Sequence, residues 1–325
     1  MAEFDVLAAG DLNVDLLLSG CPAPEPGKER LARGMNYTLG GSAAIFACNL
    51  AALGARVCFA AKVGRDAPGE FCLEQLRARG VDVSGVRLSD EHRTGISVIL
   101  AVEGQAQKAI LTYRGAMERL EEADIPDELL RRARHLHVAA FYLLPALQPG
   151  CARLFERARA SGLTTSLDTN DDPDERWNSN LLEVLKFTDI FFPNRREALS
   201  IAGESDLCRA ARKLARFGLA RIGLAGCART VAAKADADGA VLAGAVSGSP
   251  LELRVPRANV EFVEATGAGD SFDAGFLFRY LGGAPPQDCL RFANACGALA
   301  VTAVGGTEAF RRPDLHAKLK EVEMG

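Results

Sequence analysis

The sequence predicts an α/β fold in which helices cover a mostly parallel central sheet and a small second sheet forms a lid. Segments typical of strands and helices alternate from His135 onward, as they do in parallel sheets. The chain opens with a largely apolar segment, Phe4–Ala9, which ends in a polar turn and is typical of a buried strand. Separate extended segments earlier in the chain predict the small sheet.

The elements of the main sheet follow in order along the chain. Strands are expected at Phe4–Ala9, Arg56–Val63, His135–Ala140, Leu163–Asp168, Thr188–Phe192 and Ala220–Ala225, with an edge hairpin of Val231–Lys234 and Val241–Val246. Helices are expected from Gly40 through Leu53 and from the N-cap Asp66 to Arg79, each closed by a glycine. The pattern over residues 268–319 is largely helical.

The small sheet comes from two stretches of the chain. Thr94–Val102 and Lys108–Tyr113 flank a polar turn and predict a β-hairpin. We expect one domain over residues 1–325, with a lid formed by about residues 12–39 and 92–116 inserted into it. Apolar residues on the lid strands also predict a homodimer that pairs through the lid.

Composition excludes several classes of protein. The net charge of −4 and the isoelectric point near 5.7 leave no basic field for binding nucleic acid. Nine cysteines without a Cys-x-x-Cys spacing are typical of reduced thiols. No apolar run reaches the roughly 18 residues of a membrane span. We therefore expect a cytoplasmic protein with neither nucleic acid nor a membrane as partner.

The stretch Glu264–Phe276 places small residues and an acid where an amphipathic run begins. A helix start leaves N–H groups without partners and carries partial positive charge, so an anion is stabilised there. The Gly-Ala-Gly sequence at 267–269 exposes the backbone, and Asp270 follows in the first turn. A capped helix with Thr266 as N-cap is the alternative, but it does not explain both glycines.

Polar residues also follow several predicted strands. They lie at 10–15, 168–172 and 193–197, and in open α/β sheets ligands bind beyond the carboxyl ends of the strands. Asp168 and Asn170 are candidates for polar groups near a phosphate, with a plain strand-end turn as the alternative. We expect the acid of the glycine motif to join this edge.

Three motifs together resemble the ribokinase-like, or PfkB, carbohydrate kinases over nearly the whole chain. Gly40–Gly54 and Glu264–Gly275 are similar to the two family signatures, and Pro193–Ala198 to the Asn-x-x-Glu motif between them. The resemblance implies a three-layer α/β/α sandwich and transfer of the γ-phosphoryl group of ATP to a hydroxyl of a monosaccharide. It also implies Mg²⁺ and leaves the use of a monovalent cation open.

The resemblance assigns roles to individual residues. Asp270 would be the catalytic base, and residues 267–270 the anion hole. The other implied positions are Gly267, Ala268 and Gly269 for catalysis, Asn194 and Glu197 for Mg²⁺, Asn194, Gly226, Thr266 and Asn294 for the nucleotide, and Asn13, Asp15, Gly40 and Gly41 for the sugar. A capping box for Asn194 and Glu197, and an Asx turn for Asn13 and Asp15, remain alternatives.

Some residues depart from the family pattern. Ile45 stands at a sugar-contacting position where many members have Asn, so sugar recognition must differ. Arg114 offers a cation to an acidic or phosphorylated substrate, with a solvated edge-strand arginine as the alternative. An acidic-sugar kinase, a nucleoside kinase and a catalytically silent binding protein therefore remain alternative functions.

The helix start would also lower the proton affinity of Asp270. A weak base is nevertheless sufficient if the proton of the acceptor hydroxyl is transferred late in the reaction.

Overall fold

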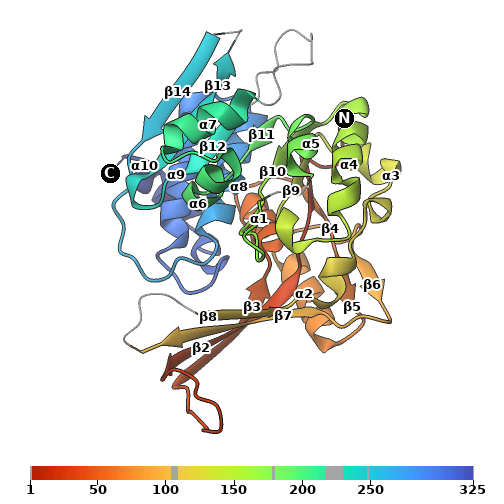
Figure 1. The fold of residues 1–325 in the computed structure, drawn as a ribbon, viewed down its shortest axis with the longest axis vertical. Coiled ribbons are helices and arrows are strands. Elements are labelled where there is room, and N and C mark those ends of the chain that lie inside the picture. Colours follow the sequence, from red (N-terminus) through yellow and green to blue (C-terminus); the bar gives the residue numbers. More distant parts are fainter. Residues whose placement is uncertain (1, 104–108, 178–179, 217–229, 247–248, 325) are drawn as a thin grey trace.

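A computed structural model describes residues 2–103, 109–177, 180–216, 230–246 and 249–324 (Figure 1). Its central sheet contains β1 (Val6–Ala9), β4 (Val57–Ala60), β9 (His135–Val138), β10 (Thr164–Leu167), β11 (Ile190–Phe191), β12 (Thr230–Lys234), β13 (Ala240–Val246) and β14 (Ser249–Val255). The strand order over the described ranges is β14-β13-β12-β11-β10-β9-β1-β4. All neighbouring pairs from β4 to β12 are parallel, whereas β13 and β14 are antiparallel at one edge.

A separate small sheet projects from the body, at the bottom of Figure 1. It consists of β2 (Asn13–Cys21), β3 (Gly34–Gly40), β7 (Gly95–Val102) and β8 (Ala109–Tyr113), in the order β3-β2-β7-β8. The expected hairpin of β7 and β8 is confirmed. The register sets Asn13 opposite both Gly40 and Gly95, so the start of β2 lies between its two neighbouring strands where the small sheet joins the body.

Two sequence predictions for strands need correction. The single strand expected over Arg56–Val63 is wrong: the chain leaves the central sheet after β4, and β5 (Lys62–Gly64) pairs with β6 (Arg87–Ser89). The Arg87 N–H donates to the Ala61 carbonyl over 2.8 Å, which holds the chain where it changes sheet. The strand β14 was not predicted. The strand expected over Ala220–Ala225 lies outside the described residues.

Helices form a layer on each side of the central sheet, which confirms the predicted fold class (Figure 1). One layer holds α3 (Asp127–Leu130), α4 (Gln148–Ala160), α5 (Leu181–Leu185), α6 (Arg195–Ala202) and α7 (Leu207–Arg216). The other holds α1 (Ser42–Ala52), α2 (Ala67–Ala78), α8 (Ala268–Leu281) and α9 (Pro286–Ala300), and α10 (Leu315–Met324) packs on α9. Alternate side chains of β1 enter the two cores, with Leu7 in one and Ala8 in the other. None of the helices in the described ranges has the length and apolar character needed to cross a membrane.

Asp66 ties α2 to the small sheet as well as capping the helix. Its carboxylate accepts from the N–H of Gly69 at 3.0 Å, as predicted for an N-cap, and from the N–H and hydroxyl of Thr94 at 3.0 and 2.5 Å.

Asp66→Ala should therefore lower the free energy of unfolding by about 2 kcal/mol, which is at the upper end of the range for loss of a helix cap. Urea denaturation measures this. Asp206→Ala is the control, because Asp206 accepts from the Arg209 N–H (2.8 Å) at an exposed helix start. An equal loss in both variants would contradict the tie to Thr94.

Candidate functional site

Two cavities adjoin at the carboxyl ends of the central strands. The larger has a volume of about 1010 Å³ and the smaller about 520 Å³. Asn170 lines both cavities, and the chain at 265–267 separates them, with Thr266 facing the larger and Ala265 and Gly267 the smaller. The site is therefore a pair of adjoining compartments, as transfer of a group between two ligands requires.

The expected polyol-binding pair lines the larger cavity. Asn13 Nδ2 donates to Asp15 Oδ1 at 2.8 Å and to Ser97 Oγ at 3.1 Å. Burial raises the pKa of Asp15 to about 6, against the hydrogen bond from Asn13, and the charge of Asp11 raises it further. Both residues lie in β2 of the small sheet, and the hydrogen bond to Ser97 ties the pair to β7.

Both glycines at the start of the first signature lie close to these acids. A Cβ at Gly40 would collide with the Asp15 carboxylate. Gly41 lines the cavity with a φ of 96°, and a Cβ there would lie 2.6 Å from the Asp11 carbonyl oxygen. Glycine at these positions thus permits the close approach of β3, the turn after β1 and α1.

Asp11 is a cavity residue that had no role in the sequence prediction. Its carboxylate accepts from the N–H groups of Ser42 at 3.0 Å and Ala43 at 2.8 Å, and so caps α1. Burial raises its pKa to about 6, although these two N–H groups oppose the shift. The sequence signal that could have identified Asp11 was an acid just after a buried strand, in a chain whose next helix begins with Gly-Gly-Ser.

Ile45 is buried and is not among the described residues that line either cavity. It packs against Gly306 so closely that a Cβ on that glycine would lie 2.6 Å from Ile45 Cδ1. Asn49, one turn further along α1, donates to the Gly306 carbonyl oxygen and to Ser271 Oγ, each at 2.9 Å. The helix α1 therefore supports the start of α8 at this position.

Arg114 lies at the end of the small sheet and lines the larger cavity with β7 and β8 residues. Its guanidinium pairs with Glu118 at 3.2 Å and stays half-exposed. The small sheet thus supplies one wall of the cavity, through Ser97, Ile99, Ile110 and Thr112.

The start of α8 opens into the smaller cavity. Gly267, and not Thr266, is the N-cap, with a φ of 76°, and a Cβ there would lie 2.6 Å from Gly306 Cα. Thr266 instead hydrogen-bonds through its hydroxyl to Glu264. Within the described residues, the N–H groups of Gly269 and Asp270 have no acceptor, whereas Ala268 donates to the Ala265 carbonyl at 3.3 Å. Two backbone donors are thus free for an anion.

Asp270 stands where the two cavities adjoin. It lines the smaller cavity, and its carboxyl group lies near Ser42, which lines the larger. Burial raises the pKa of Asp270 well above its usual value, the charge of Asp168 adds to this, and Lys234 opposes it. The expectation that the helix start lowers its proton affinity is therefore wrong, because burial and neighbouring carboxylates outweigh the helix dipole.

Asn194 and Glu197 form the capping box that was kept as an alternative. Asn194 Oδ1 accepts from the Glu197 N–H, and Glu197 Oε2 accepts from the Asn194 N–H, both at 2.9 Å. Both residues also line the smaller cavity. Burial and the charge of Asp168 raise the pKa of Glu197 to about 7. Capping therefore places a buried carboxylate at the cavity and does not exclude a metal role.

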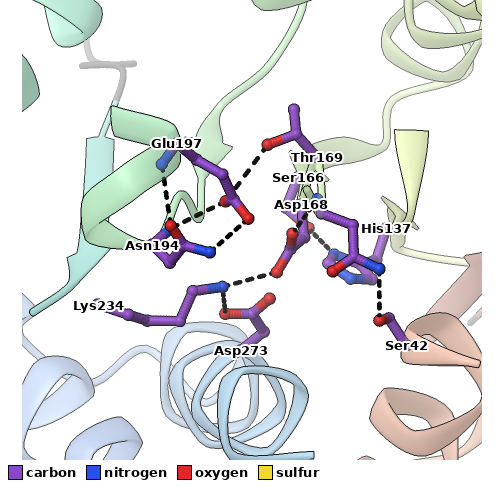
Figure 2. A network of polar contacts seen from close by, with 10 residues as sticks. Ser42, His137, Ser166, Asp168, Thr169, Asn194, Glu197, Lys234 and Asp273 are labelled. Carbon is purple, nitrogen blue, oxygen red and sulfur yellow. Dashed lines mark hydrogen bonds and ion pairs between the residues drawn. The ribbon is translucent and has the colours of Figure 1, made fainter. Parts of the chain in front are cut away.

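An ion cluster missed by the sequence prediction closes one side of the smaller cavity (Figure 2). Lys234 Nζ lies 2.6 Å from Asp168 Oδ2 and 3.3 Å from Asp273 Oδ1. Burial opposes a charged ammonium, but the carboxylates, chiefly Asp168, raise the pKa of Lys234 above its usual value. Asp168 thus lies near the helix start, as expected, and Asn170 donates to Ser42 Oγ over 3.0 Å.

The smaller cavity also has apolar lining residues, among them Val260, Phe262 and Val301. Asn294 lines it too, with its amide donating to the Pro256 carbonyl oxygen at 2.9 Å. The expected nucleotide residue Gly226 lies outside the described residues. A cavity with both apolar lining and a free helix start suits a ligand with a flat base and a phosphate chain.

The fold and the two adjoining cavities are those of a small-molecule kinase, a phosphotransferase with an alcohol group as acceptor. The chain belongs to the PfkB family, since residues 5–312 match the model of the pfkB family carbohydrate kinases. The expected family membership is therefore confirmed, and the chain is an enzyme of this family.

The similar proteins act on different acceptors. An ATP-dependent ribose-1-phosphate kinase of Halopiger xanaduensis is 30% identical, covering 97% of this chain and 98% of its own. A 2-dehydro-3-deoxygluconokinase of Bacillus subtilis is 33% identical over 82% of each chain. The structure of Arabidopsis thaliana ribokinase complexed with ribose and ATP has a TM-score of 0.81 at 24% identity over 99% of both chains, which shows the shared fold.

Proposed function

We propose that this kinase transfers the γ-phosphoryl group of MgATP to a hydroxyl of a monosaccharide. The observation that carries the proposal is the position of Asp270, which lines one cavity and lies near Ser42, a residue that lines the other. The sugar occupies the larger cavity and the nucleotide the smaller. The names of the relatives support this, because they are kinases of sugars and sugar derivatives.

Asp270 is the proposed base for the acceptor hydroxyl. Phosphoryl transfer depends on positioning and charge stabilisation, and the free N–H groups of Gly269 and Asp270 supply donors for the phosphoryl oxygens. A carboxyl with a raised pKa is a stronger base, so it takes the hydroxyl proton more readily than an ordinary aspartate. Residues 267–270 thus supply the proposed anion hole and base together.

Glu197 and Asn194 are the proposed residues for Mg²⁺. The ion, when bound with ATP, neutralises charge on the phosphates. Mg²⁺ prefers oxygen ligands and keeps part of its hydration shell, so contact through water suits these side chains. The buried Glu197 carboxylate, with its pKa raised to about 7, gains stability from a nearby cation, which fits this role.

Asn13 and Asp15 are the proposed ligands of paired sugar hydroxyls. Asp15→Asn should raise the KM for the acceptor about tenfold, since it replaces a charged acceptor of hydrogen bonds by a neutral one. The KM for ATP should stay unchanged. In the wild type the acceptor KM should also rise as the pH falls through about 6, where the Asp15 carboxylate is protonated, and this rise should weaken in the variant.

Steady-state kinetics against both substrates between pH 5 and 8 measure these effects, within the range where carboxyl groups of raised pKa titrate. Asp90→Asn is a matched control, because Asp90 forms an exposed ion pair with Arg65 and neither residue is among the described residues lining the larger cavity. An acceptor KM in Asp15→Asn equal to that of the wild type would contradict the sugar contact.

An acidic or phosphorylated sugar is a second candidate acceptor. Arg114 and Arg176 both line the larger cavity and supply two cations. The names of the ribose-1-phosphate and 2-dehydro-3-deoxygluconate kinases support such an acceptor. Charge-assisted contacts to a phosphate or carboxylate would then select the substrate.

A coupled assay of ADP release distinguishes the candidates. It compares pentoses, hexoses, acidic sugars, sugar phosphates and nucleosides, with and without K⁺. A neutral monosaccharide as the best acceptor supports the first proposal, and an anionic sugar whose turnover depends on Arg114 supports the second. A nucleoside as best acceptor, or no turnover with any acceptor, would contradict both.

We also propose a homodimer that pairs through the lid. The lid comprises about residues 12–39 and 92–116, and one face of its sheet exposes the apolar side chains Met35, Leu111 and Tyr113. Such a face on a small sheet is stabilised by pairing with a second copy. Light scattering should give the mass of a dimer, and Leu111→Lys should give a monomer. A monomeric wild type at working concentration would contradict this.

A cytoplasmic location is the remaining proposal. Eight cysteines in the described residues are free and buried, among them Cys58 and Cys151, which supports a reducing environment. Imaging of the tagged full chain tests the location.

A further inference from the structure

Lys234 ends β12 in an unusual position for a lysine. Its side chain is only 14% exposed, and it reaches from the sheet to the end of β10 and to α8 through Asp168 and Asp273 (Figure 2). These two carboxyl groups are 6% and 1% exposed. A charge removed this far from water needs partners, and the cluster supplies them.

The ammonium of Lys234 retains one donor for a ligand. Of its three N–H groups, two serve Asp168 and Asp273, and within the described residues the third has no acceptor. A Cβ at Gly269 would lie 3.6 Å from Lys234 Nζ. The free N–H groups of Gly269 and Asp270 line the same cavity, so three unused donors lie close together.

The charges around the smaller cavity favour a cation beside a bound phosphate chain. Its described lining includes four acids, Asp168, Glu197, Asp236 and Asp270. Lys234 and the exposed Arg257 are the cations among those lining residues, and Lys234 is the one beside the helix start. Without it, the phosphates would face several carboxylates at the point of transfer, where repulsion is strongest.

We infer that Lys234 contacts the transferring phosphoryl group and stabilises its charge, with Asp168 and Asp273 holding the ammonium in place. This inference rests on the proposed function, which puts the nucleotide in the smaller cavity. The competing explanation is that Lys234 serves only to neutralise Asp168. The two explanations differ in what happens once the Asp168 charge is gone.

The test introduces Lys234→Met into a protein that already carries Asp168→Asn. Lys234→Met alone leaves a buried carboxylate unpaired and endangers folding, whereas the double variant removes both charges. Calorimetry measures binding of MgATP and of adenosine, and kinetics measure kcat, for the wild type, Asp168→Asn and Asp168→Asn/Lys234→Met. Lys213→Met is the control, because Lys213 bonds Ala202 and Glu204 away from both cavities.

The double variant should bind MgATP at least about tenfold more weakly than Asp168→Asn, and its kcat should be about 100-fold lower, as expected for loss of a charged donor at the phosphoryl group. Adenosine should bind both equally, and Lys213→Met should match the wild type. Equal MgATP binding and equal kcat in the two Asp168→Asn proteins would overturn the inference, and so would an equal loss of adenosine and MgATP binding.

Failure of the proposed function gives a different result. A wild type that binds MgATP but phosphorylates no acceptor contradicts the proposed reaction, while the comparison of MgATP with adenosine still tests Lys234. A wild type that binds no MgATP would overturn both.

Discussion

Asp270→Asn should lower kcat by roughly two to four orders of magnitude, because an amide cannot accept the proton of the acceptor hydroxyl. The same environment predicts the pH dependence of the wild type. Since burial and the charge of Asp168 raise the pKa of Asp270 well above that of an ordinary aspartate, kcat should fall as the pH is lowered through this raised value. Steady-state kinetics at saturating substrates over a pH series measure both effects.

The stability of Asp270→Asn separates lost chemistry from lost folding. An acid whose pKa is raised by folding destabilises the folded state at any pH above the pKa that the acid has in the unfolded chain, so the variant should melt no lower than the wild type at neutral pH. Asp288→Asn is the matched control, as Asp288 is exposed in the first turn of α9. A near wild-type kcat in Asp270→Asn would refute the role of the base.

Gly269→Ala should lower kcat roughly 100-fold while the protein stays folded, since a methyl group beside the free N–H donors displaces the phosphoryl group. The added Cβ makes only ordinary contacts, the nearest at 3.5 Å to Lys234 Cδ, so the folded chain accommodates it. Alanine also favours the helix more than glycine, which should hold or raise the melting temperature. Kinetics and thermal melting of the same preparation measure the two effects.

Gly282→Ala is the control for Gly269→Ala. Gly282 caps the other end of α8 with a negative φ of −78°, and a Cβ there would lie 3.4 Å from the Arg279 carbonyl oxygen. Its kcat should match that of the wild type. If Gly269→Ala also turns over at the wild-type rate, the anion hole is not at this helix start.

Features that depend on neighbouring residues could be predicted from the sequence. The Asp66 cap, the capping box of Asn194 and Glu197, and the hairpin of β7 and β8 depend on short spacings with a known geometry, and the structure has them. Alternation of strands and helices was sufficient for the parallel strands β9, β10 and β11. The short strand β5 was misjudged, because its partner β6 lies far along the chain and the apolar pattern does not show which sheet a strand joins.

The charged cluster depended on contacts that no spacing reveals. Lys234 is 66 residues from Asp168 and 39 from Asp273, and a lysine at the end of a strand is normally solvated. For the same reason the raised pKa of Asp270 was not foreseen, since it follows from burial and from a carboxylate on another element. Ile45 was noticed as a departure, but its packing on Gly306 appears only in three dimensions.

Transfer of a labelled γ-phosphoryl group from ATP to an acceptor tests the central claim most directly. The reaction mixture contains the wild type or Asp270→Asn, Mg²⁺ and the best acceptor from the coupled assay, and the products are separated and counted. The account predicts that the label appears in a sugar phosphate, in an amount equal to the ADP formed, and that Asp270→Asn transfers almost none. Label released only as inorganic phosphate, or equal transfer by both proteins, would contradict it.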